Sequence, residues 1–256
     1  MEIVSNNSTE IGDLGNTLLE IGALLMSAGA NTGRIRTTVN RISEAFGYKT
    51  DLFVIHRAIF LTLHDANNKD VFNSLKRTST IGVNFKIVSG ISRMSWAVVN
   101  ENWLLPKIKN ELNRLTSLPP YPQWITLPLT GLAGASFCKL AGGSATDMLI
   151  IFVATIAGLS MRQYTTKLRF NGYLCIYFAS LTATIIAAIA MKYATMSQQS
   201  FATAALFLVP GVPLINSFSD LIDGNLQNGI VRGFNGLIIS FAIALGMITT
   251  LLIFRT

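Results

Sequence analysis

The residues best suited to chemistry stand in one stretch, FLVPGVPLINSFSDLIDGNLQNGIVR, which covers residues 207–232. It begins in an apolar run, which a proline-glycine pair interrupts. Five residues at or just past this interruption could contact a polar substrate or an ion: Pro210, Gly211, Asn216, Asp220 and Asn225. Proline removes a backbone donor and kinks a helix, and broken backbone at membrane depth is tolerated only where protein or a water-filled cavity covers it. The stretch therefore predicts a broken membrane helix that lines a path. The alternative is a span that ends at Phe218 and is followed by a solvated acidic loop, and spacing alone favours neither.

Charged side chains on both sides of the following loop suggest an ion pair. Asn216 and Asp220 are four residues apart and share one face if the helix continues. Arg232 follows the loop and is opposite in charge to Asp220, so we expect the two to pair, and we expect exchanging the two charges to restore function. Arg232 and Lys139 could neutralise a substrate carboxylate.

A second acidic residue, Asp147, stands at the mouth of an earlier apolar span. An ionisable group inside lipid would indicate function, so Asp147 or Asp220 could carry a coupled proton. The alternative role for Asp147 is a helix-start carboxylate that the helix dipole stabilises.

Composition divides the chain near residue 120. The whole chain is 50% hydrophobic and 13% charged, with a net charge of +7, whereas soluble domains carry about 25% charged residues. All but three of the 13 acidic residues precede Pro120. We therefore expect a cytoplasmic domain over residues 1–120 and a transmembrane domain over residues 121–256. No basic patch with interleaved aromatic residues is present, so nucleic acid is not an expected partner.

Apolar spacing in the first 120 residues predicts a small α+β domain. Steps of three and four residues predict a helix over 11–25, and Asn31 can cap a second helix that Gly47 ends. Short apolar runs predict a β-hairpin over 52–55 and 58–64. A third strand over 74–81 and helices over 85–99 and 106–115 complete the expected elements.

This domain carries no recognisable catalytic motif. The two histidines, His56 and His64, lie at the ends of the predicted hairpin strands, and no cysteine accompanies them. No HExxH, clustered-carboxylate, GxSxG or phosphate-binding glycine pattern is present. We therefore expect no enzyme, no metal and no cofactor. A membrane-anchored enzyme and a regulatory scaffold are the less favoured alternatives.

Hydropathy predicts an α-helical integral membrane protein with five transmembrane helices, at about 124–140, 147–161, 173–193, 201–218 and 230–254. A helical span needs roughly 20 apolar residues. The fourth is short and interrupted, as binding segments of transporters often are. Arg162, Lys167 and Arg169 cluster after the second span. Lys and Arg accumulate in cytoplasmic loops, so we expect a cytoplasmic N-terminus and an external C-terminus.

The chain resembles the threonine/serine exporter family in LLMSAGANTGRIRTTVNRISEAFGY, in GGSATD and in LVPGVPLINSFSDLIDGNLQNGIVRG. The family pattern maps onto Gly29, Thr32 and Arg34 in the first domain, and onto Asp147, Pro210, Gly211, Asn216, Asp220, Asn225, Gly229 and Arg232 in the membrane. Many members carry Glu where this chain has Asn31, which weakens any role for a carboxylate there.

The resemblance also implies a partner. Single-chain members look like this chain followed by a further membrane region, whereas the length here resembles the larger subunit of a split exporter. The split pair is associated with succinate export, and the fused form with threonine and serine export. The implied protein is a subunit of an ion-driven secondary exporter in the bacterial inner membrane, in contact with lipid. It would form a hetero-oligomer with a small four-helix membrane partner and move a small carboxylate substrate.

Overall fold

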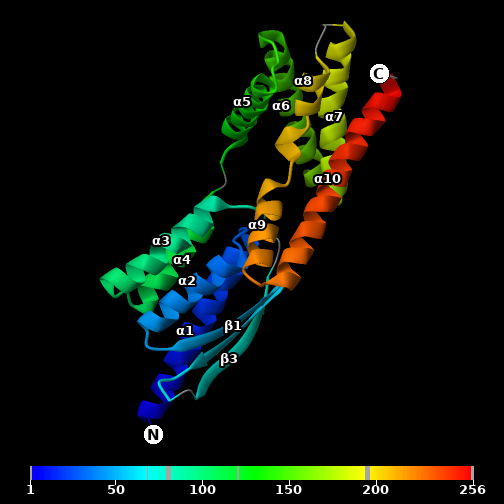
Figure 1. Cartoon of the computed structure of the whole chain (residues 1–256). Helices are drawn as coiled ribbons and strands as arrows, with labels where there is room; N and C mark the ends of the chain where they lie inside the picture. Colours follow the sequence, from blue (N-terminus) through cyan, green and yellow to red (C-terminus); the bar gives the residue numbers. More distant parts are fainter. Residues whose placement is uncertain (1, 68, 79–81, 120, 194–196, 255–256) are drawn as a thin grey trace. The chain divides into compact units, whose positions relative to one another are not determined.

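The computed structural model describes residues 2–67, 69–78, 82–119, 121–193 and 197–254 of the chain. It is mostly helical, with one small sheet (Figure 1). The chain divides into two compact units. The first unit contains residues 1–119 and 212–233, and the second contains residues 120–211 and 234–256. The predicted boundary at residue 120 coincides with one point of this division, but residues 212–233, which we assigned to the transmembrane domain, group with the N-terminal part.

The first unit combines helices with a three-stranded antiparallel sheet in the order β1-β2-β3. Its elements are α1 (Glu2–Ser27), α2 (Thr32–Ala45), β1 (Lys49–Ile55), β2 (Ala58–His64), β3 (Asp70–Arg77), α3 (Phe85–Glu101), α4 (Leu105–Ser117), α9 (Gly211–Ile222) and the start of α10 (Leu226–Phe254). Helices α1 and α2 cover one face of the sheet (Figure 1). Their apolar faces and the inward residues of β2 form one core.

Alternation of side chains along β2 explains the sheet. Ile59, Leu61 and Leu63 are fully buried, as a period of two requires for a strand with one covered face. The predicted hairpin over 52–64 is confirmed. The third strand begins at Asp70, four residues earlier than predicted, and ends at Arg77, while residues 79–81 of the prediction lie outside the described residues.

Local signals also place the ends of α2. Asn31 caps this helix, because its Oδ1 accepts the N–H of Arg34 at 2.8 Å. Gly29 before the helix and Gly47 after it have φ angles of +89° and +81°, in the left-handed region that glycine adopts most readily. The predicted cap at Asn31 and the predicted stop at Gly47 are therefore confirmed.

The second unit is built from α5 (Gln123–Leu140), α6 (Ala145–Lys167), α7 (Gly172–Tyr193), α8 (Gln198–Thr203), a 3₁₀ turn (Leu206–Leu208) and the remainder of α10. Small residues let the helices approach closely. Gly134 of α5 lies against Thr155 of α6, and Gly158 of α6 lies against the backbone of Ala179 in α7, so a side chain at either glycine would collide. Cys138 and Cys175 are buried free thiols.

Three helices of the described chain are long and apolar enough to cross a membrane, namely α6, α7 and α10. A fourth candidate exists if the helices before and after the break at Pro210 are counted as one span. The break itself is confirmed, because the 3₁₀ turn ends at Leu208 and α9 begins at Gly211. The predicted first span falls on α5, which is not among these candidates, so the number of spans supported is three or four and not five.

Candidate functional site

Helix α9 and the start of α10 form a tight helical hairpin in the first unit. Gly224 makes the turn with a φ of +78°, and the N–H of Asn225 donates to the carbonyl of Asp220 at 2.7 Å. Across the hairpin, the hydroxyl of Ser217 donates to the carbonyl of Gly229 at 2.6 Å. Gly229 permits this approach, because a side chain there would collide with Leu221.

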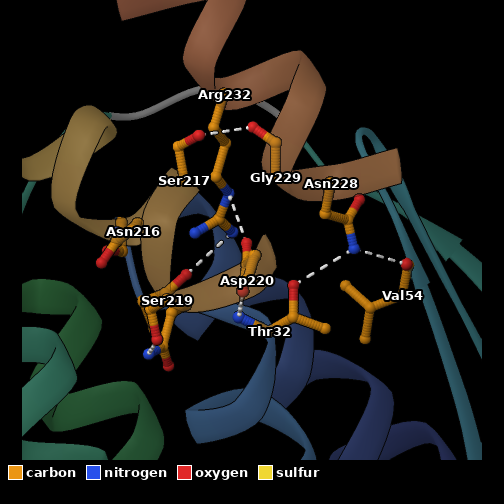
Figure 2. Close-up of polar contacts among 12 residues, drawn as sticks. Thr32, Val54, Asn216, Ser217, Ser219, Asp220, Asn228, Gly229 and Arg232 are labelled. Atoms are coloured by element: carbon orange, nitrogen blue, oxygen red, sulfur yellow. Dashed lines mark hydrogen bonds and ion pairs between the residues drawn. The ribbon is translucent and has the colours of Figure 1, made fainter. Parts of the chain in front are cut away.

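Asp220 lies at the centre of a polar cluster that joins this hairpin to α2 (Figure 2). The side chain of Asp220 has no exposed surface. Its Oδ1 accepts the backbone N–H of Thr32, the first residue of α2, at 2.8 Å. The first N–H groups of a helix lack partners within the helix, and a carboxylate there also interacts favourably with the helix dipole. Asp220 therefore stabilises the beginning of α2 from a distant part of the chain.

Arg232 of α10 completes this cluster as the partner of Asp220. Its Nε lies 3.3 Å from Oδ2 of Asp220, so the ion pair expected from the sequence is confirmed. Another nitrogen of the same guanidinium donates to the carbonyl of Ala30 at 2.9 Å. The Arg232 side chain is 17% exposed. Its positive charge is thus compensated inside the protein, which leaves it poorly suited to neutralise a substrate.

Asparagine and serine side chains extend the polar cluster that joins the helical hairpin to α2, which we call the joint. Asn228 of α10 donates to the hydroxyl of Thr32 at 3.1 Å and to the carbonyl of Val54 in β1 at 2.8 Å (Figure 2). Asn216 donates to the carbonyl of Gly29 at 2.7 Å, and Asn31 donates to the hydroxyl of Ser219 at 2.8 Å. The helical hairpin of α9 and α10 is therefore attached to both α2 and the edge strand β1. Sequence reasoning missed Asn228, Ser217 and Ser219, because nothing near them in the sequence indicates their partners.

A pocket of about 690 Å³ lies beside this joint. Its polar lining comes from α2, the preceding loop and the hairpin: Asn31, Arg34, Arg36, Thr37, Asn216, Asp223 and Asn225. Its apolar lining comes from α3 and α9: Phe85, Val88, Val212 and Ile215. The structure thus brings together seven of the predicted site residues in or beside the pocket: Gly29, Thr32, Arg34, Asn216, Asp220, Asn225 and Arg232.

The other three predicted site residues, Asp147, Pro210 and Gly211, belong to the second unit. Asp147 is the third residue of α6 and forms a capping box with Ser144. Its Oδ2 also accepts a hydrogen bond from the hydroxyl of Ser200 at 2.7 Å, and Asp147 as a whole is 5% exposed. This geometry is that of the helix-start carboxylate, the alternative that the sequence left open.

The histidines lie apart from the joint's hydrogen bonds. His56 lies in the turn between β1 and β2. Loss of part of the hydration of its ring, together with the positive charges of Arg57 and Arg232, lowers its pKa. The Nε2 of His64 lies 3.0 Å from Oδ2 of Asp51. Within the described residues, no three His, Cys, Asp or Glu side chains are grouped so that they could hold a metal ion.

Comparison with known proteins gives a consistent set of relatives. Residues 16–254 match the family model described as "Putative threonine/serine exporter". The chain is 25% identical over 241 residues to the protein of Escherichia coli (strain K12) named "Probable succinate transporter subunit YjjP", with 92% of each chain covered. Its identity to the protein of the same name from Klebsiella aerogenes is 24% over 236 residues, with 90% of each covered.

A longer relative is the "Threonine/serine exporter" of Corynebacterium glutamicum, which is 21% identical over 250 residues. The match covers 93% of this chain but only 51% of that protein. No solved structure matches the chain.

Proposed function

We propose that the chain, which belongs to the threonine/serine exporter family, is one subunit of a secondary exporter. This exporter moves small carboxylate metabolites, in the first place succinate-like dicarboxylates, out of the bacterial cytosol. The observation that carries the proposal is the match over 92% of both chains to a protein named as a succinate transporter subunit. Export of threonine or serine is the second candidate, favoured by the longer relative. We propose no catalytic activity for the chain.

The difference in length between the relatives supports the proposal of a partner subunit. The relative named as a probable transporter subunit is matched over 92% of its length, whereas this chain covers only about half of the relative named as an exporter. The remaining half would be supplied here by a separate small four-helix membrane protein. The functional unit is then a hetero-oligomer in the inner membrane.

We also propose five spans, with α5 as the first. This helix has 18 residues, which at 1.5 Å per residue gives a length of about 27 Å, close to the roughly 30 Å of a hydrocarbon core. Trp124 near its start is 76% exposed, as suits an aromatic residue at the membrane interface. With the basic loop after α6 in the cytoplasm, the N-terminus is cytoplasmic and the C-terminus is external.

The residues that we propose for the substrate or ion pathway are Asp147, Pro210, Gly211, Asn216, Asp220, Asn225 and Arg232. The break at Pro210 supports it, because interrupted helices bind substrates in many secondary transporters. Asp147 and Asp220 are both buried carboxylates and are the candidates for carrying a coupled proton. The hydrogen bonds of Asp220 to Thr32 and its ion pair with Arg232 also give it a role in holding the joint together.

The test is efflux from loaded vesicles that contain the full chain with and without the small partner. Labelled succinate and labelled threonine are followed in parallel. Succinate efflux that requires both proteins supports the dicarboxylate exporter, and threonine efflux transfers the protein to the amino-acid branch. If both proteins are folded in the vesicles and neither substrate leaves, the proposal is wrong.

A further inference from the structure

We infer that the pocket between α2 and α9 is a binding site for the carboxylate group of a small organic acid, held by Arg34 and Arg36. The inference deepens the proposed function, on which it rests, because it assigns substrate recognition to the first unit and to residues other than Arg232. The pocket's volume of about 690 Å³ lies within the range of about 300–1,000 Å³ that is usual for small-ligand sites.

The two arginines of α2 are the available cations of this pocket. Both side chains are exposed and line it, and among the described residues no carboxylate lies within ion-pair distance of either one. Arg232, in contrast, already pairs with Asp220. A guanidinium matches the planar geometry of a carboxylate and binds it through two parallel hydrogen bonds. An incoming organic anion would therefore find its counter-charge at Arg34 and Arg36.

An unpaired amide points to a further ligand contact. Arg36 donates to Oδ1 of Asn225 at 3.3 Å, and because arginine has donors only, this contact fixes which end of the Asn225 amide faces it. Nδ2 of Asn225 is then buried with no hydrogen-bond partner in the described part of the chain. Since Asn225 lines the pocket, a carboxylate oxygen bound there would satisfy this donor. Buried donors are expected to have partners.

The apolar part of the pocket lining suits a short carbon chain. Phe85 and Val88 of α3 face it together with Val212 and Ile215 of α9. Methylene groups of a bound acid would contact this apolar surface while the carboxylate contacts α2. The lining thus combines polar groups that can hold a carboxylate with apolar side chains that can contact methylene groups.

Asp223 distinguishes the two kinds of acid that could occupy the site. It is the one carboxylate in the pocket lining, and its Oδ2 accepts a long hydrogen bond of 3.4 Å from Ser219. A negative charge here repels the second carboxylate of succinate but attracts the ammonium group of threonine. Asp223→Asn should therefore strengthen binding of succinate and weaken binding of threonine.

The experiment measures binding of labelled succinate and labelled threonine to the purified full-length chain in detergent. We expect at least one of them to bind, and we expect Arg34→Gln and Arg36→Gln each to reduce its affinity about tenfold or more, which corresponds to 1.4 kcal/mol. The matched control is Arg77→Gln, which removes the same charge from an exposed position of β3 outside the pocket. Its affinity should stay within about twofold of wild type.

Two results would overturn the inference. One is that folded wild-type chain binds neither acid, and the other is that an Arg34→Gln, Arg36→Gln double variant binds as tightly as the control. The vesicle assay separates this failure from failure of the proposed function. Unchanged efflux in the double variant contradicts the binding site alone, whereas absence of efflux in wild type contradicts the exporter and leaves the binding result standing.

Discussion

Removing the carboxylate of Asp220 should destabilise the first unit more than any other single change of charge in the described structure. Asp220 is fully buried, it accepts the N–H of Thr32 at 2.8 Å and it pairs with Arg232 at 3.3 Å. Asp220→Ala leaves the arginine without its counter-charge and the beginning of α2 without its acceptor. Losing one partner of a buried ion pair costs about 3–5 kcal/mol.

The exposure of Arg232 decides where in that range the cost falls. Its side chain is 17% exposed, so water compensates its charge only in part after the substitution. Asp220→Asn should cost less than Asp220→Ala, because an amide oxygen can still accept the Thr32 N–H. For a folding unit of this size, a loss of about 4 kcal/mol lowers the melting temperature by roughly 10 °C.

The assay is thermal unfolding of purified full-length protein in detergent. Asp13→Ala is the matched control, since it breaks the exposed ion pair between Asp13 and Lys109, whose side chains are 57% and 41% exposed. Exposed pairs contribute about 0–1 kcal/mol. If Asp220→Ala unfolds at the same temperature as Asp13→Ala, the reasoning from burial is wrong.

Double variants test whether the two charges act together. Replacing Asp220 and Arg232 jointly with Leu and Met should cost less than the sum of the two single changes, because no buried charge is left unpaired. Exchanging the two charges should not restore stability, although the sequence alone suggests that the exchange would restore function. An arginine at position 220 would place a donor beside the Thr32 N–H, which needs an acceptor. Full rescue by the exchange would refute this assignment of the Thr32 contact.

Three further changes test separate parts of the first unit. Asn228→Ala removes the donor to the Val54 carbonyl at 2.8 Å and should cost about 1–3 kcal/mol, which chemical denaturation of the full chain would measure. Gly29→Ala forces a side chain into a φ of +89° and should cost about 1–2 kcal/mol. Its control is Gly12→Ala, where no atom lies within 4 Å of the new methyl group and which should stabilise α1 by about 0.5–1 kcal/mol. Because the pKa of His56 is lowered in the folded protein, the unfolded chain binds more protons than the folded protein near pH 6. The stability contributed by neutral His56 is therefore lost as pH falls below 6.5. His56→Gln should therefore reduce the difference in melting temperature between pH 7.5 and pH 5.

Distinct outcomes would contradict these three predictions. Unchanged unfolding of Asn228→Ala would mean that another donor or water satisfies Val54. Equal stability of the two glycine variants would show that the backbone at Gly29 adapts to a side chain. An identical dependence of melting temperature on pH in wild type and His56→Gln would exclude His56 as a source of that dependence.

Short-range features of this protein could be predicted from its sequence. The β-hairpin of β1 and β2 follows from the alternation of Ile59, Leu61 and Leu63. The ends of α2 follow from the Asn31 cap and Gly47. The helix break follows from Pro210, whose ring restricts the backbone wherever it stands. These features depend on dihedral preferences and periodicities that a window of a few residues already contains. The resemblance to the exporter family likewise came from motifs within short stretches, and the family model that matches residues 16–254 confirms it.

Only the tertiary structure decided which charged groups have partners. The contact between Asp220 and Thr32 joins positions 188 residues apart, and the contact between Asn228 and Val54 joins positions 174 residues apart. The sequence offered Arg232 both as the partner of Asp220 and as a cation for substrate. Folding pairs it with Asp220 and leaves Arg34 and Arg36 facing a pocket. The physical reason is that a charge is neutralised by its neighbours in space, and composition and spacing carry no record of neighbours that the fold alone brings together.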